Sequence, residues 1–124
     1  MIFSVGYGNR KPSEFLELLQ KHKIRMIIDV RAYRKAWTKM YSAPRFSKWL
    51  EENEVKYTWA HMLGNKDRVH PDNFELDDKQ KKYLKCVGPL SRVAIMCAET
   101  KTDSCHRKKF VEYLRSLGYE VEEI

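Results

Sequence analysis

No stretch of this sequence approaches the roughly 18 apolar residues that a transmembrane helix requires. Residues 1–6 also lack the basic region and the long apolar region of a signal peptide. Cysteine is scarce, since the 124 residues include only three, and an odd number argues against the disulfide framework of a small secreted protein. We therefore expect a cytoplasmic protein with no membrane partner.

Charge is unbalanced, with 24 Lys and Arg against 17 Asp and Glu and a formal net charge of +7. Half of the basic residues but only 6 of the acidic ones lie in residues 1–60. Such an excess favours an anionic partner, such as a nucleotide, a nucleic acid or a phosphate ester. The hydrophobic content of 43% is typical of a globular protein, and the length fits one domain over residues 1–124.

Short apolar segments alternate with segments of helical periodicity along the whole chain. We predict strands at 2–5, 24–30, 55–59, 93–97 and 119–124, and helices at 12–22, 46–53, 77–87 and 105–117. Residues 32–45 and 60–76 are expected to be irregular. This alternation predicts an α/β protein, a single Rossmann-like three-layer domain with about five mostly parallel strands and helices on both faces.

Polar residues follow the predicted strands where each one ends, and ligands of such sheets bind outside the carboxyl ends of the strands. We therefore expect the functional site in the crevice at these ends. As catalytic residues we predict Cys97, Glu99, Cys105, His106 and Asp29. As residues that bind an anionic substrate we predict Tyr7, Asn9, Arg10, Arg31, His61 and Arg107.

The most informative pattern is Cys97-Ala98-Glu99, followed after five residues by Cys105-His106-Arg107. Cys105 falls in the first turn of the last predicted helix, with Asp103 or Ser104 as the expected N-cap. Cations are unfavourable at a helix N-terminus, so the basic run that begins there suggests a bound anion. A thiol at that position would also have a lowered pKa and a higher reactivity.

Two other interpretations of these cysteines stay open. Cys97 could be a small residue of the core, with the basic run simply solvated. Alternatively, Cys97, Cys105 and His106 could bind zinc, with His61 or Cys86 as a further ligand. The separation of the cysteines is not that of a compact zinc knuckle, so we predict neither a metal nor another cofactor.

Two smaller patterns lie at the ends of the first and second strands. The glycines of Gly6-Tyr7-Gly8 allow a tight turn and a close approach of the backbone to a phosphate, but the third glycine of a dinucleotide fingerprint is absent. Asp29 and Arg31 lie on the same side of an extended chain. Arg31 could bind an oxyanion that Asp29 helps to orient, or the two could form an ion pair that closes the strand end.

Residues 31–49 contain no acidic residue, and cations alternate there with aromatic residues. Cations beside exposed rings suit single-stranded nucleic acid, whereas Phe46 and Trp49 fit the core of a short helix. We therefore expect an anionic small molecule or nucleotide as partner, with nucleic acid as an alternative through residues 31–49. The sequence indicates no oligomeric state.

Taken together, these motifs resemble the domain-of-unknown-function 488 family. The resemblance rests on Gly6-Tyr7-Gly8-Asn9-Arg10, Asp29-Val30-Arg31 and the two cysteine segments, and it covers nearly the whole chain. It implies an α/β fold and no established activity. The family usually has His-Ser where this chain has Tyr7-Gly8, so no role for a histidine carries over.

A looser similarity is to rhodanese-like domains. It rests on Asp29-Val30-Arg31, on a strand that ends at Cys97, and on the closing Leu-x-x-Leu-Gly-Tyr-x-Val segment at 114–121. This similarity implies that Cys97 forms a persulfide, although the loop after it is longer and acidic. Three functions follow as alternatives: an enzyme acting on a phosphorylated or nucleic-acid-derived substrate, a non-catalytic binding module, and a thiol sulfurtransferase.

Overall fold

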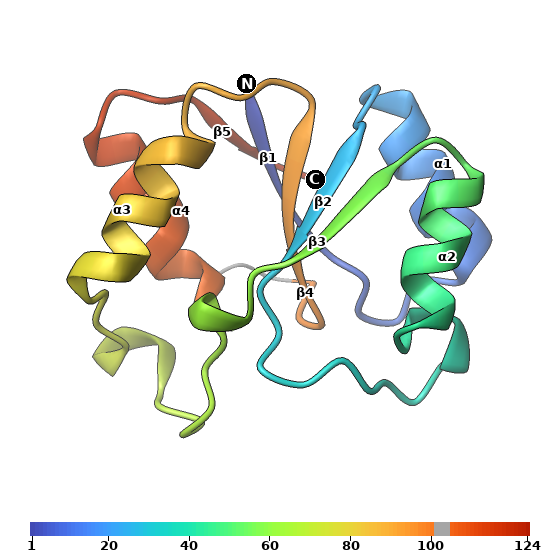
Figure 1. Cartoon of the computed structure of the whole chain (residues 1–124), viewed down its shortest axis with the longest axis horizontal. Helices are drawn as coiled ribbons and strands as arrows, with labels where there is room; N and C mark the ends of the chain where they lie inside the picture. The colour runs from blue at the N-terminus through green and yellow to red at the C-terminus, as the bar shows by residue number, and fades with distance from the viewer. Residues whose placement is uncertain (101–104) are drawn as a thin grey trace.

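A computed structural model of the chain describes residues 1–100 and 105–124. Five strands and four α-helices alternate in it (Figure 1). The strands are β1 (Ile2–Gly6), β2 (Met26–Asp29), β3 (Lys56–Trp59), β4 (Val93–Cys97) and β5 (Val121–Glu123). The helices are α1 (Pro12–Lys21), α2 (Arg45–Glu52), α3 (Asp78–Val87) and α4 (Arg107–Ser116).

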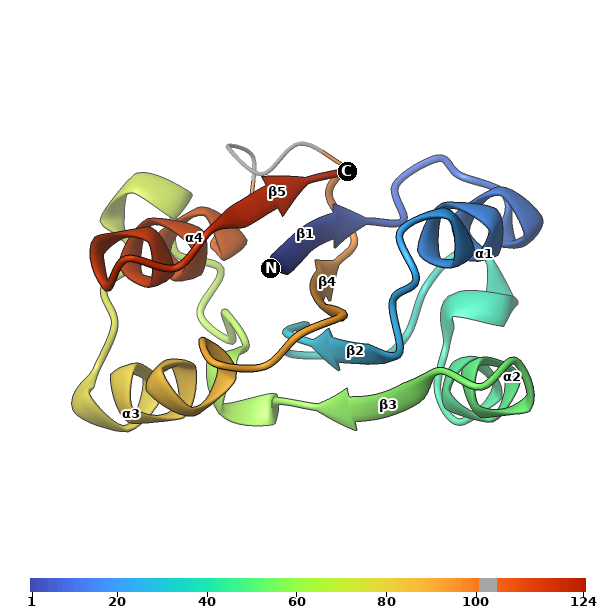
Figure 2. The same ribbon diagram turned by 90° about the horizontal axis from the view of Figure 1, so that it is seen from above.

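The strands form one sheet in the order β3-β2-β4-β1-β5, and every neighbouring pair is parallel. Helices α1 and α2 cover one face, and α3 and α4 cover the other (Figures 1 and 2). The predicted three-layer α/β domain is therefore confirmed. Because all strands run in the same direction, their carboxyl ends meet at one edge of the sheet.

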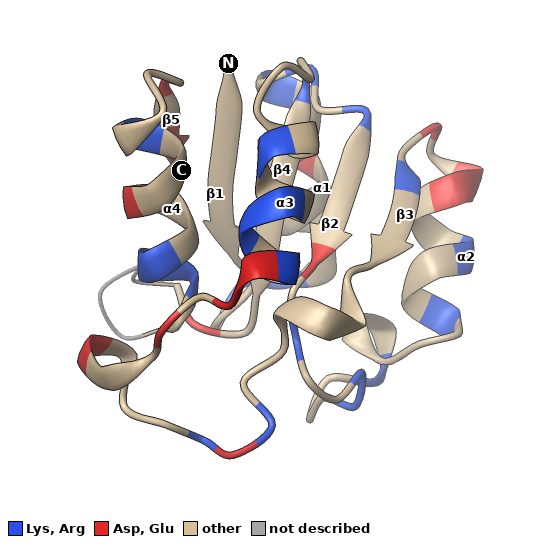
Figure 3. Cartoon of the chain, turned by 60° about the vertical axis from the view of Figure 1, so that its left-hand side comes forward, with Lys and Arg blue, Asp and Glu red and all other residues tan. Residues whose placement is uncertain are grey.

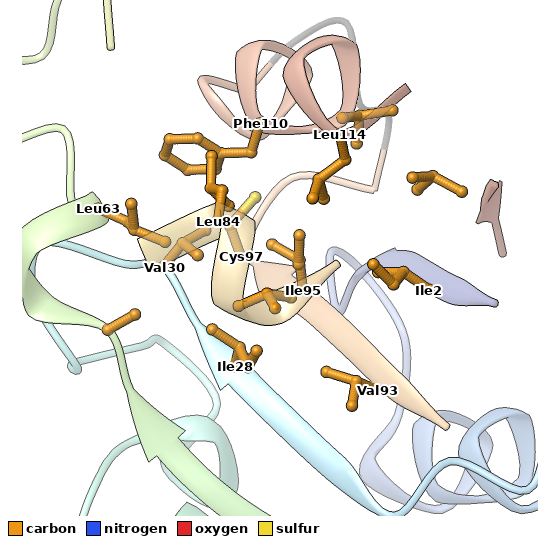
Figure 4. Packing of buried hydrophobic residues seen from close by; sticks show 14 of the residues in the cluster. Ile2, Ile28, Val30, Leu63, Leu84, Val93, Ile95, Cys97, Phe110 and Leu114 are labelled. Carbon is orange, nitrogen blue, oxygen red and sulfur yellow. The ribbon is translucent and has the colours of Figure 1, made fainter. Parts of the chain in front are cut away.

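Side chains of the central strand β4 alternate between the two faces, as the period of two in a strand requires. Val93, Ile95 and Cys97 pack toward α3 and α4, where Phe110 and Leu114 meet them (Figure 4). The intervening Ala94 and Met96 pack in the second core, beneath α1 and α2. Both cores consist of apolar side chains, which pack on the two faces of the sheet.

The segments expected to be irregular contain three short 3₁₀ turns, at Lys39–Tyr41, His61–Leu63 and Pro71–Asn73. Helix α4 begins at residue 107, two residues later than predicted. The expected N-caps Asp103 and Ser104 lie outside the described residues. Among the residues that are described, no helix is long and apolar enough to cross a membrane. Strands are mostly uncharged, and the Lys and Arg residues lie largely on helices and loops (Figure 3).

Candidate functional site

A cleft of about 490 Å³ lies at the carboxyl ends of β1, β2 and β4. Six of the residues predicted for the site line it: Tyr7, Arg31, Cys97, Glu99, Cys105 and His106. The loops that follow β2 and β3 contribute further lining residues, namely Tyr33, Lys35, Asn65, Arg68, Val69 and Pro71. The sheet topology thus brings the ends of three strands into one concave site, which is where parallel α/β folds bind ligands.

Beneath this cleft, Asp29 and Arg31 form a fully buried ion pair. Arg31 donates from its Nε and Nη2 atoms to Asp29 at 2.8–3.1 Å. Its Nη1 donates to the carbonyl oxygen of Tyr41 at 2.8 Å. Each guanidinium nitrogen therefore already serves a protein acceptor. This is the closed ion pair that the sequence left as an alternative, and it fixes the residues after β2 to the sheet.

Tyrosines complete the surroundings of this pair. The Tyr57 hydroxyl donates to Asp29 Oδ2 at 2.5 Å, and burial followed by the Asp29 charge raises the pKa of Tyr57. The Tyr7 and Tyr41 rings stack at 4.3 Å. Burial also raises the pKa of Tyr7, although the nearby Arg31 charge opposes that rise. All three phenols accordingly stay protonated near neutral pH. Tyr57 and Tyr41 donate hydrogen bonds, Tyr41 to the carbonyl oxygen of Arg10 at 2.8 Å, whereas Tyr7 accepts one from Arg31 Nη1 at 3.5 Å.

Arg107, the first residue of α4, is completely buried. Its Nη1 atom donates to the carbonyl oxygens of Val5 at 2.6 Å and Glu99 at 3.0 Å. The same atom approaches Cys97 Sγ at 3.0 Å. Arg107 therefore joins α4 to the ends of β1 and β4 from below the cleft, whereas Arg31 reaches the strand ends from the opposite face of the sheet.

Cys105 lies just before α4 and faces the cleft, although only 5% of its surface is exposed. Its sulfur accepts from the backbone N–H of Arg107 at 3.4 Å and lies 3.4 Å from Nδ1 of His106. His106 Nε2 lies 3.0 Å from the carbonyl oxygen of Val30. A carbonyl oxygen only accepts hydrogen bonds, so Nε2 carries a hydrogen. Nδ1 is then the ring nitrogen that can exchange a proton with Cys105.

The Cys97 thiol donates to the carbonyl oxygen of Glu99 at 3.9 Å, and its interaction with Cys105 couples the ionisation of the two cysteines. The pKa of Cys105 is lowered to about 5, mainly by the hydrogen bond from Cys97. Hydrogen bonds from His106 and from the Arg107 amide lower it further, whereas burial raises it. Burial, followed by the interaction with Cys105, raises the pKa of Cys97. These shifts favour the thiolate form of Cys105 and the protonated form of Cys97.

The glycine turn after β1 packs against the chain itself. Tyr7 and Gly8 donate their backbone N–H groups to the carbonyl oxygens of Cys97 and Ala98 at 3.2 and 2.7 Å. A Cβ atom on Gly6 would lie 1.6 Å from the carbonyl oxygen of Glu99. The close backbone approach that the two glycines predicted is thus made to residues 97–100, and it positions the Glu99 wall of the cleft.

Four predicted binding residues are not among those that line the cleft: the buried Arg107, and Asn9, Arg10 and His61. Asn9 and Arg10 line a neighbouring hollow beside Trp37, and Arg10 donates to the carbonyl oxygen of Gly6 at 2.8 Å. His61 lines another hollow below β3, with its ring 4.5 Å from that of Trp59. The substrate-binding and catalytic roles of all the predicted residues stay predictions.

Residues 31–49 divide into a buried and an exposed set. Tyr41 and Phe46 belong to the core under α1 and α2, and Arg34 stacks on the Trp59 ring at 4.0 Å. Tyr33 is 63% exposed and Trp37 is completely exposed. Tyr33 and Trp37 are therefore the exposed rings of this segment, and Trp49 is partly buried and lines a hollow on α2.

Lys35, Asn65 and Arg68 were missed as residues of the cleft. They come from irregular segments of 14 or more residues, so neither periodicity nor a motif indicates where their side chains lie. Lys35 and Arg68 are exposed, and neither forms a salt bridge with the described part of the chain. The positive charge of residues 31–49 was the one signal that pointed to Lys35.

The zinc interpretation finds no support in the arrangement of the cysteines. Within residues 1–100 and 105–124, no group of three or more His, Cys, Asp or Glu side chains is placed to hold a metal ion. His106 uses Nε2 for Val30 and Nδ1 for Cys105, so its ring is committed to those partners.

One comparison with known proteins gives a match. The model of the family described as "Domain of unknown function DUF488" matches residues 11–88, which is more than half of the chain. No curated protein and no solved structure matches the chain. The matched range ends before Cys97, so the cysteine segments at the cleft lie outside it. The resemblance indicated by the motifs is confirmed, and the chain belongs to the DUF488 family.

Proposed function

We propose that this protein is an enzyme that binds an anionic small molecule in the strand-end cleft and attacks it with the Cys105 thiolate. The observation that carries the proposal is the position of Cys105. Its sulfur lines the cleft and is held by hydrogen bonds from Cys97 and from the Arg107 backbone amide. Donors directed at a sulfur stabilise the ionised form, which is the nucleophilic one.

Positive charge at the cleft supports an anionic substrate, such as a phosphorylated small molecule. Arg31 and Arg107 donate to protein acceptors, so among the described lining residues we expect Lys35 and Arg68 to bind the ligand's charge. Both are exposed, and a substrate between them and Cys105 would fill the cleft. Tyr7 could orient that substrate by its hydroxyl, since burial and stacking hold its ring in place.

The chemical step is a nucleophilic displacement. Cys105 Sγ forms a bond to the electrophilic atom of the substrate, and the bond to the leaving group breaks with its electron pair on that group. Water then attacks the covalent intermediate, the S–X bond breaks, and the thiolate is restored. His106 Nδ1 lies close enough to the sulfur to accept or return a proton, which gives it a role as acid or base.

Protection of Cys105 from alkylation tests this function. In a Cys86→Ser protein, inorganic phosphate should slow the reaction of iodoacetamide with Cys105 in a saturable way at constant ionic strength. The Lys35→Gln/Arg68→Gln double variant should lose about 1–2 kcal/mol of binding, which raises the half-protecting concentration about 5- to 30-fold.

The matched control is Arg45→Gln/Lys48→Gln, which removes the same two charges from α2, away from the cleft. It should change the half-protecting concentration less than about 2-fold. Absence of protection by phosphate, or an equal effect in the two double variants, would refute the anionic site.

Nucleic-acid binding is a second candidate, favoured by the exposure of Trp37 and Tyr33 within the acid-free segment. Stacking on exposed rings beside Lys35 and Lys39 is how single strands are held without sequence preference. Affinity for an oligonucleotide should then fall steeply with salt and drop by about 1–3 kcal/mol in Trp37→Ala. A flat salt response would remove this candidate.

A further inference from the structure

Seven residues separate Cys97 from Cys105 along the chain, and the structure brings both to the same cleft. Arg107 contacts both sulfurs. Its Nη1 atom lies 3.0 Å from Cys97 Sγ, and its backbone N–H donates to Cys105 Sγ at 3.4 Å. The interaction between the two thiols acts on both, since it lowers the pKa of Cys105 and raises that of Cys97. Both cysteines are free in this state, and both line the cleft.

The surroundings of the two sulfurs differ in a way that suits sequential attack. Both cysteines belong to the apolar core that includes Leu84 and Phe110, in which Cys97 ends a strand (Figure 4). Cys105 Sγ lies beside the Arg107 backbone N–H and His106 Nδ1, whereas Cys97 Sγ lies beside the Arg107 guanidinium. An ionised thiol attacks first, and a protonated thiol beside it resolves the product. The directions of the two pKa shifts agree with that order.

We propose that Cys97 and Cys105 form a reversible disulfide by exchange with a small anionic disulfide that enters the cleft. The proposal rests on the proposed function only in that both use the Cys105 thiolate. The cations Lys35 and Arg68 at the mouth of the cleft favour an anionic reagent. Cys86, which is exposed on α3, lies outside the cleft and takes no part.

Exchange proceeds in two balanced steps. The Cys105 thiolate attacks one sulfur of the small disulfide, forms a mixed disulfide and releases the other half as a thiolate. Cys97 then loses its proton to solvent or to His106 and attacks Cys105 Sγ, which releases the second half. The pair loses two electrons and its one proton in all, and the small disulfide becomes two thiolates, to one of which that proton can return.

Oxidation would switch the site off. The disulfide consumes the thiolate that the proposed function needs, and it replaces the hydrogen bond between the thiols by a covalent bond. Because Cys97 ends the rigid strand β4 and Cys105 precedes α4, the bond would tie the last helix to the centre of the sheet. Reduction restores both thiols, so the site would respond to the redox state of its surroundings.

The experiment uses the full chain carrying Cys86→Ser and dithiobis(nitrobenzoate), a dianionic aromatic disulfide. We expect about two nitrothiobenzoate ions per chain, a protein mass that is lower by about two hydrogens, and no retained adduct. In the Cys86→Ser/Cys97→Ser variant, about one ion is expected, with a stable adduct on Cys105. Retained adducts on both cysteines of the first protein, or no reaction of Cys97, would overturn the proposal.

Charge selectivity gives a second readout. The dianionic reagent should oxidise the pair at least about 3-fold faster than cystamine, a cationic disulfide, relative to their rates with free cysteine. Lys35→Gln/Arg68→Gln should remove that preference, and Arg45→Gln/Lys48→Gln should keep it. A pair that is oxidised without charge preference refutes the anionic reagent. Phosphate-sensitive alkylation of Cys105 without disulfide formation refutes only the redox proposal and leaves the proposed function standing.

Discussion

Replacing Cys97 tests how the thiolate on Cys105 is stabilised. The Cys97 thiol is the principal donor to Cys105, and a hydrogen bond to a charged group contributes about 1.5–3 kcal/mol. One pKa unit corresponds to about 1.4 kcal/mol, so Cys97→Ala should raise the pKa of Cys105 by about 1–2 units. The value would move from about 5 to about 6–7. Cys97→Ser keeps a donor and should leave the pKa within about half a unit.

The assay is the pH dependence of iodoacetamide alkylation in the Cys86→Ser background. A thiol with a pKa of about 5 is almost fully ionised from about pH 6 upward, whereas a free thiol of pKa about 8.5 gains roughly 75-fold in thiolate between about pH 6 and 8. Nucleophilicity falls as the pKa falls, by about 0.4–0.5 log units per pKa unit. The rate at a single pH is therefore a poor indicator, and the inflection is the quantity to measure.

The expected result is a profile that is flat between about pH 6 and 8 for the parent and for Cys97→Ser, with the inflection displaced upward in Cys97→Ala. A parent inflection near that of free cysteine would refute the stabilised thiolate. An inflection unchanged in Cys97→Ala would show that Cys97 is not the donor that stabilises it.

Three further substitutions test the contacts around the cleft. Asp29→Asn leaves the buried Arg31 without its carboxylate, so the free energy of unfolding in urea should fall by about 3–5 kcal/mol; a loss below about 1 kcal/mol would contradict the buried ion pair. Gly6→Ala places a methyl group against the Glu99 carbonyl and should cost about 1–3 kcal/mol in the same assay, whereas unchanged stability would refute that packing. In His106→Phe the new ring fits beside Phe74 and Phe110, but the Val30 carbonyl oxygen loses its hydrogen bond, which should lower the free energy of unfolding by about 1–3 kcal/mol. The same substitution should raise the pH at which the alkylation rate of Cys105 inflects. An unchanged inflection would exclude His106 as a partner of Cys105.

Most of the fold could be predicted because its elements follow directly from local sequence. The apolar segments at 93–97 and 24–30 have the composition of buried parallel strands, and Gly118 follows α4 where its apolar periodicity stops. The order of the strands in the sheet could not be predicted in this way. The central position of β4 depends on pairing with both β1 and β2, which are distant in sequence.

The sequence predicted where the candidate site lies, but it did not predict which contacts the side chains around the cleft make. The rule that ligands bind at strand ends grouped Tyr7, Arg31 and the two cysteines correctly in one cleft. It did not indicate that Arg31 donates hydrogen bonds to Asp29 and to the Tyr41 carbonyl oxygen. The contact with Tyr41 depends on the path of residues 32–45. The contact between the two thiols likewise depends on how α4 docks on β4, which no spacing along the chain reveals.

The account depends most directly on Cys105 being a reactive thiolate inside the cleft. Limited alkylation of the wild-type protein with iodoacetamide at about pH 6, followed by mass spectrometry of its peptides, measures this at each cysteine. The account predicts that Cys105 is modified before Cys86, although Cys86 is exposed and Cys105 is buried. Modification of Cys86 first, with Cys105 unreactive until the protein unfolds, would contradict it.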